Sequence, residues 1–237
     1  MADQFLRSGI AGIDRVNFDA GLRAHMLRVF NYMGGGLALT GIVAFVVANT
    51  PLAGVIFGSP LKWIAMLAPL VFLMYMQVKV NSVTAAQLQT RFWIFCGLMG
   101  LSMAALFLIF TGASVARAFF ITGATFGAMS LYGYTTKRDL TGMGSFMMMG
   151  MLGLMIASLV NIFLMSSMMQ WVVSVGGVVI FTGLTAYQVQ TIKETYAESA
   201  GREANDKLAV WSALTLYLSF INLFQFILEL TGTMRRN

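Results

Sequence analysis

The sequence predicts an all-α membrane protein, built as a bundle of seven transmembrane helices. Of its 237 residues, 58% are hydrophobic and only 10% are charged, whereas about 25% are charged in an ordinary soluble domain. The apolar residues also fall into continuous runs rather than alternating with polar ones. This pattern favours helices over barrel strands, because a helix satisfies every backbone hydrogen bond within its own segment.

Seven apolar segments approach the length of about 20 residues that a helix needs to cross the hydrocarbon core. They predict spans at residues 29–48, 62–80, 92–111, 115–136, 143–165, 169–190 and 208–228. Together these spans form one transmembrane domain over residues 29–230, between a polar N-terminal tail (1–28) and a C-terminal tail (231–237). The N-terminal tail fits either a weakly amphipathic helix at the membrane surface or a partly ordered segment.

Breaks in the apolar runs set the expected turns. The 53 residues between Asp139 and Lys193 carry no charge, which is too long for one span and suits two. We place the turn between them at Ser166 and Ser167. The sequence Thr-Gly-Ala-Ser at residues 111–114 separates the third span from the fourth.

The net charge of +6 comes from 15 basic and 9 acidic residues. If the seven spans cross the membrane in turn, eleven basic residues lie on the same side of the membrane as the N-terminus and four lie on the opposite side. Basic loops stay in the cytoplasm, so this asymmetry predicts a cytoplasmic N-terminus. The lipid bilayer is the expected partner, because the membrane topology and the anionic lipid headgroups account for the basic residues between the apolar runs. We therefore expect no nucleic-acid partner.

The titratable residues argue against an enzyme. None of the nine acidic residues lies deep in a span, and Glu229 comes only at the end of the seventh. His25 is the only histidine, and we expect it to be an interfacial or solvated side chain of the N-terminal tail. Neither a Ser-His-Asp triad nor a metal site can be built from this set, so we expect no catalytic residues, no metal and no cofactor.

Uncharged polar residues recur along one face of each of the last two spans. In the seventh span they are Ser212, Thr215, Ser219 and Asn222, at the helical spacings of three and four residues, and in the sixth they are Ser174, Thr182, Thr185 and Gln188. Two interpretations stay open for this polar seam. It could be a set of hydrogen bonds that hold the helices together, or a path that water can enter.

Two further patterns have a packing and a functional interpretation. Methionines at residues 143, 147, 151 and 155 could bind Cu(I), although methionine commonly fills gaps in a core. The motif Gly123-x-x-x-Gly127 predicts close approach of a neighbouring helix within the chain or in a dimer.

Four segments resemble the bacterial branch of the Bax inhibitor-1 family. They are residues 58–63 (Gly-Ser-Pro-Leu-Lys-Trp), 131–140 (Leu-Tyr-Gly-Tyr-Thr-Thr-Lys-Arg-Asp-Leu), 156–163 (Ile-Ala-Ser-Leu-Val-Asn-Ile-Phe) and 216–224 (Leu-Tyr-Leu-Ser-Phe-Ile-Asn-Leu-Phe). The resemblance extends from about residue 20 to 232. It implies a bacterial inner membrane location and a seven-helix fold whose last helix is central, wrapped by two layers of three helices.

The resemblance also implies a pH-sensitive calcium leak, gated in better-understood members by two aspartates that share a proton. This sequence departs from that pattern at both positions. Gln188 stands where the sixth-helix aspartate is typical, and Ser219 stands where the seventh-helix aspartate is typical. Neither side chain carries a charge, so we expect weak Ca²⁺ attraction and a leak that is weak or independent of pH. The alternative is a non-conducting interaction protein, such as a modulator or substrate of a membrane-bound AAA protease.

Overall fold

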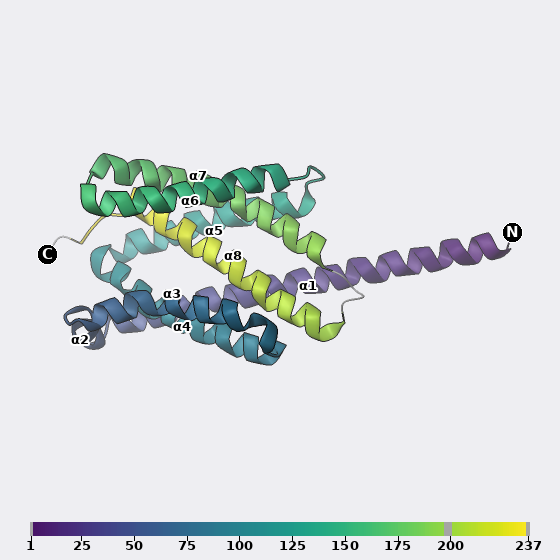
Figure 1. Cartoon of the computed structure of the whole chain (residues 1–237), viewed down its shortest axis with the longest axis horizontal. Helices are drawn as coiled ribbons and strands as arrows, with labels where there is room; N and C mark the ends of the chain where they lie inside the picture. Colours follow the sequence, from purple (N-terminus) through teal and green to yellow (C-terminus); the bar gives the residue numbers. More distant parts are fainter. Residues whose placement is uncertain (1, 197–200, 236–237) are drawn as a thin grey trace.

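The computed structural model describes residues 2–196 and 201–235, with side chains for residues 20–80, 82–196 and 201–235. The described chain is almost entirely helical (Figure 1). Its elements are α1 (Ala2–Ala48), α2 (Leu52–Phe57), α3 (Leu61–Lys79), the 3-10 turn η1 (Val80–Ser82), α4 (Ala85–Ile109), α5 (Gly112–Thr135), α6 (Thr141–Leu164), α7 (Ser167–Thr195) and α8 (Arg202–Thr231).

Seven of these helices are long and apolar enough to cross a membrane. They are α3 to α8 and the Ala20–Ala48 part of α1. The six-residue helix α2 is far too short for this and joins α1 to α3. The expected all-α bundle with seven spans is confirmed.

Helix α8 lies at the centre of the bundle. It packs against α1, α4, α5 and α7, and Figure 1 shows it crossing between one layer of α1, α3 and α4 and another of α5, α6 and α7. Its side chains include Leu216, Tyr217 and Leu223, which are completely buried. In contrast, α6 has almost no buried residue, which suits a helix whose outer face meets lipid. The expected central position of the last helix is confirmed.

Several helices extend beyond the apolar runs from which the spans were predicted. Helix α4 begins at Ala85 rather than near residue 92, because Thr84 and Gln87 form a capping box around its first turn. Helix α8 likewise begins at Arg202, with Glu203 in its first turn. Hydropathy marks where a helix enters hydrocarbon, whereas capping marks where the helix begins.

Polar caps also form the two expected turns. Thr111 accepts a hydrogen bond from the Ser114 amide at the start of α5, and Ser166 accepts one from the Met169 amide at the start of α7. Between α6 and α7, Met165 has a φ of 49°, a left-handed conformation that ends α6 in the way a glycine usually does.

A glycine allows two helices around α8 to pack closely, but this glycine is not part of the expected Gly123-x-x-x-Gly127 motif. A Cβ at Gly133 of α5 would overlap the carbonyl oxygen of Ala186 in α7, so these helices touch backbone to backbone. At Gly123 and Gly127, a Cβ would meet nothing within 4 Å. The prediction that Gly123-x-x-x-Gly127 brings another helix of the chain close is therefore wrong, since both residues face a groove.

We expect Gly133→Ala to lower the free energy of unfolding by about 1–3 kcal/mol, because α5 and α7 must separate to admit a methyl group. Gly127→Ala is the matched control on the same helix. It should be neutral or stabilising by up to about 1 kcal/mol, since alanine is the better helix former. Denaturation of both variants in mixed micelles, followed by circular dichroism, measures the difference. Equal stability of the two variants would contradict the close contact.

Candidate functional site

The two polar residues at the expected gate positions meet between α7 and α8. The Ser219 hydroxyl donates a hydrogen bond to Oε1 of Gln188 over 2.8 Å. Ser219 is only 2% exposed, and Gln188 is half-buried. Each side chain reaches the other from the central face of its own helix, so this pair joins the outer helix α7 directly to the central helix α8.

A second hydrogen bond joins the same two helices near the C-terminal end of α8. The buried Ser174 hydroxyl donates to the exposed Glu229 carboxylate over 2.7 Å. Between the two bonds, a Cβ at Gly177 would collide with the Phe226 ring, so the helices are also closely packed there. Two side-chain hydrogen bonds thus join α7 to α8, and only the one near the C-terminal end of α8 involves an acidic residue.

Apart from Ser174, the other members of the polar seam do not link the two helices. Hydrogen bonds join Thr185 to the Phe181 carbonyl, Thr215 to the Trp211 carbonyl and Asn222 to the Leu218 carbonyl, each one turn earlier in the same helix. Ser212 is buried. The Thr182 hydroxyl is buried without a hydrogen-bond partner among the described residues. The structure therefore brings Gln188 and Ser219 together, but it forms no hydrogen-bonded chain along the seam.

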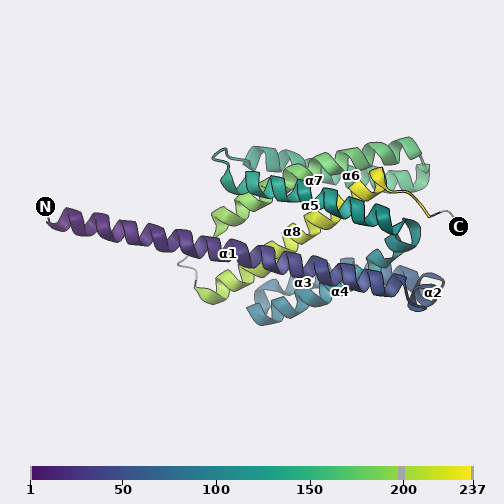
Figure 2. The same ribbon diagram turned by 180° about the vertical axis from the view of Figure 1, so that it is seen from behind.

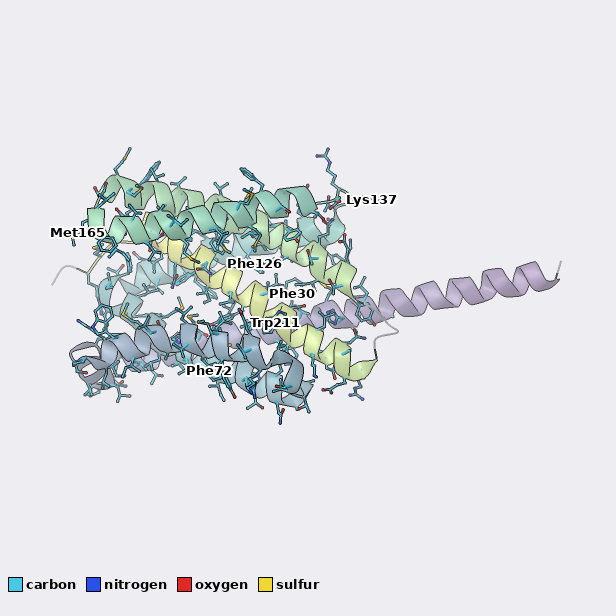
Figure 3. All side chains as sticks on the ribbon, viewed as in Figure 1. Phe30, Phe72, Phe126, Lys137, Met165 and Trp211 are labelled. Atoms are coloured by element: carbon cyan, nitrogen blue, oxygen red, sulfur yellow. The ribbon has the colours of Figure 1, made fainter. Side chains whose placement is uncertain are left out.

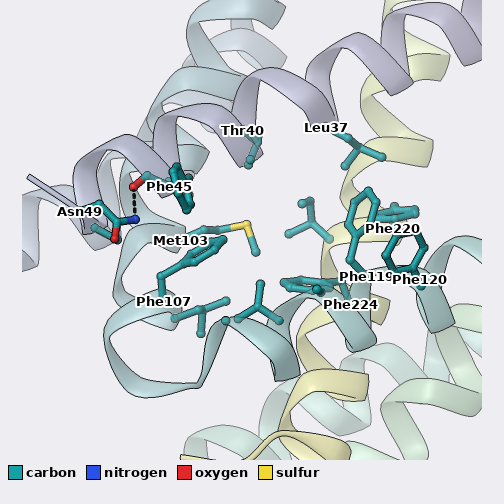
Figure 4. Close-up of a pocket in the computed structure, with 18 of the residues that line it drawn as sticks. Leu37, Thr40, Phe45, Asn49, Met103, Phe107, Phe119, Phe120, Phe220 and Phe224 are labelled. Atoms are coloured by element: carbon teal, nitrogen blue, oxygen red, sulfur yellow. Dashed lines mark hydrogen bonds between the residues drawn. The ribbon is translucent and has the colours of Figure 1, made fainter. Parts of the chain in front are cut away.

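Two sizeable cavities lie on the other side of α8, one between α1 and α5 and the other between α1, α4 and α5. Their volumes are about 480 and 550 Å³, and neither is lined by Gln188 or Ser219. Figure 4 shows the smaller one, into which Phe107, Phe119 and Phe224 project from three helices. Gln188 and Ser219 are therefore packed between helices rather than exposed in these cavities.

A buried polar cluster that the sequence did not reveal joins α1, α4 and α8. The Thr40 hydroxyl donates to the Cys96 carbonyl over 2.9 Å and lies 2.7 Å from the Tyr217 hydroxyl. Because the Thr40 proton is used on Cys96, the Tyr217 hydroxyl is the donor in the second bond. Tyr217 also packs edge-on against the rings of Phe92 and Phe95.

Polar contacts also close the end of the bundle at which α8 begins. Asp206, at the start of α8, pairs with Arg28 of α1. The Glu203 carboxylate accepts a hydrogen bond from the Ala85 amide at the start of α4 over 2.7 Å, where the helix dipole favours negative charge. The loop between α7 and α8 therefore leads into contacts that tie the central helix to the layer of α1 and α4.

Gln190 holds the loop between α5 and α6 at the same end. Its amide accepts from the Leu140 backbone and donates to the Arg138 carbonyl, each over 2.8 Å. Nearby, the exposed Asp139 accepts from the Thr141 amide, and hydrogen bonding by Thr141 lowers the pKa of this carboxyl group. Asp139 is thus held as a carboxylate that ends the loop and begins α6.

Of the two expectations for His25, interfacial or solvated, the solvated one is wrong. This side chain is only 4% exposed, and its ring lies 5.1 Å from the ring of Tyr196 at the end of α7. Because α1 is helical well before its apolar part, His25 is carried into the packing between α1 and α7. Among the described residues, no three His, Cys, Asp or Glu side chains come together as a metal site would need.

The methionine row of α6 does not present one common surface. Met147 and Met151 pack against the core, with Met147 facing Gly183 of α7, whereas Met155 is 56% exposed. Met147 fills the space that Gly183 leaves on the neighbouring helix. This is the gap-filling role that a flexible thioether suits.

Comparison with known proteins places these features in a family. The family model described as "Inhibitor of apoptosis-promoting Bax1" matches residues 22–237. An uncharacterised protein of Rickettsia prowazekii is 46% identical, over 92% of this chain and 93% of its own length. The inner membrane protein YbhL of Escherichia coli is 38% identical, over 91% of this chain and 94% of its own length.

A membrane protein of Streptococcus pyogenes, also uncharacterised, is 33% identical over 90% of this chain and 94% of its own length. The similarity therefore extends over nearly the whole bundle, including α7 and α8. This chain belongs to the Bax inhibitor-1 family of multi-pass membrane proteins.

Proposed function

We propose that this protein is a Bax inhibitor-1-type leak channel scaffold whose gate is neutral, so that any cation leak is weak or independent of pH. The observation that carries the proposal is the hydrogen bond from Ser219 to Gln188. It occupies the place where the resemblance puts two aspartates that share a proton.

The two kinds of pair respond differently to pH. Two neighbouring carboxyl groups titrate as a coupled pair, because the first charge opposes the second. Their contact therefore changes as protons bind or leave. An amide and a hydroxyl do not titrate near neutral pH, so the bond between Gln188 and Ser219 persists under acidic and basic conditions. A neutral pair also provides no carboxylate ligand for Ca²⁺, which prefers charged oxygen ligands.

Ca²⁺ flux into liposomes, measured from acidic to basic pH, tests this proposal. We expect a low flux with little pH dependence from the unchanged protein. The double variant Gln188→Asp, Ser219→Asp restores two carboxyl groups, and it should gain a leak that varies several-fold with pH. The control is Gln188→Asn, Ser219→Asn, which has nearly the same shape without a titratable group and should show no pH dependence. A strong, pH-switched flux through the unchanged protein would contradict a neutral gate.

A second candidate is a non-conducting partner of a membrane-bound AAA protease. The observation that favours it is the reach of α1, whose first residues project far beyond the rest of the bundle (Figures 1 and 2). A helix that leaves the membrane provides an accessible segment by which a protease could engage the chain or be modulated by it.

Deleting residues 2–19 tests this second candidate while leaving the Ala20–Ala48 span complete. We expect the protease to co-purify with the full chain and to be lost from the shortened one. Flux through the shortened protein should be unchanged, because the contacts between α7 and α8 remain. An identical set of partners for the two proteins would count against a role for this segment.

We further propose that the N-terminus lies in the cytoplasm. Lys137 and Met165 lie at opposite ends of the bundle (Figure 3), and Lys137 is on the side where α1 begins and most of the basic residues gather. Positively charged loops are retained in the cytoplasm, which supports this orientation.

Labelling with a membrane-impermeant maleimide on intact spheroplasts checks the orientation. Met165 is 86% exposed, while the native Cys96 is completely buried and serves as an unlabelled background. We expect Met165→Cys to be labelled from outside and Lys137→Cys to be labelled only after the membrane is opened. The reverse pattern would place the N-terminus outside.

A further inference from the structure

The face of the bundle opposite the gate positions carries a groove in the membrane-spanning region. Its walls are α1 and α5, both of which pack against α8, and Figure 2 shows α8 passing between them. The two cavities described above lie along this groove, one after the other. Each has a volume within the range of about 300–1,000 Å³ that is usual for ligand pockets.

Aromatic rings divide the groove near the middle of the bundle. Phe220 of α8 lines both cavities, and its ring lies 5.6 Å from that of Phe119 and 5.4 Å from that of Phe126, both on α5. We call the 550 Å³ cavity, on the side where α1 begins, the N-side compartment, and the 480 Å³ cavity the C-side compartment. The division leaves one compartment on each side of the Phe220 ring.

The inner part of the N-side compartment is apolar and open. Phe30, Met33 and Phe126 line it, and Gly123 and Gly127 leave space on the α5 wall, since a Cβ at either would meet nothing within 4 Å. One polar group faces this space without a partner. Ser130 is only 6% exposed, and its hydroxyl has no hydrogen bond among the described residues. A buried hydroxyl of this kind is favourable only when an occupant supplies its partner.

The mouth of the N-side compartment is positively charged. Arg23 lines it and is exposed, and it forms no ion pair with any side chain that the structure describes. Lys193 of α7 donates to the Tyr134 carbonyl over 2.9 Å and lies 5.7 Å from the centre of the Tyr134 ring. Tyrosine with basic neighbours is typical of the depth at which lipid headgroups lie.

We propose that the N-side compartment holds one anionic phospholipid from the leaflet on the side where α1 begins. An acyl chain fills the space beside Gly123 and Gly127, and the Ser130 hydroxyl donates to an ester carbonyl of the lipid. The phosphate lies at the mouth beside Arg23, with Lys193 nearby. The graded chemistry favours a lipid over a second copy of the chain, because a cationic mouth, a single inner donor and an apolar end match the headgroup, ester and chain of a phospholipid in that order.

Native mass spectrometry of protein from nanodiscs containing phosphatidylglycerol and phosphatidylcholine tests the proposal. We expect the unchanged protein to retain one phosphatidylglycerol. Gly127→Leu fills the N-side compartment and should reduce this bound fraction at least tenfold. Arg23→Gln should reduce the preference for phosphatidylglycerol about fivefold, which corresponds to the loss of about 1 kcal/mol for one basic residue near an anionic surface.

Two matched variants separate this site from general effects of a larger side chain. Gly41→Leu fills the C-side compartment, and Gly153→Leu adds the same side chain to the exposed surface of α6; a Cβ at either position meets nothing within 4 Å. Both should keep the bound phosphatidylglycerol.

Three outcomes would overturn the proposal. They are an unchanged protein that retains no phospholipid, a Gly127→Leu variant that retains as much as the unchanged protein, and equal loss in Gly153→Leu. A dimer of the unchanged protein that Gly127→Leu converts to monomers would instead identify the groove as an interface between two copies.

Discussion

Hydrocarbon offers no hydrogen-bond partner to a polar group, and this constraint governs both the backbone and the few polar side chains of the bundle. The backbone meets it by forming helices throughout the seven spans. Polar side chains meet it in two ways. Thr185 and Thr215 each donate a hydrogen bond to a carbonyl one turn earlier in their own helix, so these bonds do not connect neighbouring helices. Ser219 instead bonds across to Gln188, which makes the position of α7 depend on that of α8.

The central position of α8 makes this second kind of bond important for the whole bundle. Through Tyr217 it is hydrogen-bonded to α1, and through Ser219 to α7. These contacts join the two outer layers, which otherwise meet each other little. A change in the Gln188 and Ser219 contact would therefore alter the relation between the layers, whereas a change in Thr215 would stay within α8.

The sequence was sufficient for the spans because hydropathy and polar caps are local properties. The turn at Ser166 and the break at Thr111 each follow from a short polar segment between apolar runs, and both side chains act as caps. The meeting of Gln188 and Ser219 could be expected only from the family pattern, since helical spacing gives a face but not the neighbour that it meets. The same limit explains the error at Gly127, where small residues on one face border a groove rather than a helix.

The contacts of Thr40 and His25 could not be predicted for a related reason. Each depends on which helices surround α8 and at what height, and a single sequence carries no local signal for that. Thr40 lies in an apolar run where one hydroxyl looks incidental, yet it contacts two other helices. His25 precedes the apolar run and looks solvated, yet the helix carries it into the packing. Long-range packing, rather than local chemistry, decides the role of both.

A neutral pair and a titratable pair at this contact would differ in energy. An ionised carboxylate within the bilayer costs several kcal/mol unless it is paired or solvated. Protonation of a carboxyl pair there removes this unfavourable free energy. A hydroxyl-to-amide bond between membrane helices contributes only about 0.6–2 kcal/mol, but it carries no such cost. On the proposed function, the hydrogen bond between α7 and α8 is therefore weak, and its free energy does not change with pH. On that proposal, the bundle keeps a direct contact between α7 and α8 that protons do not alter.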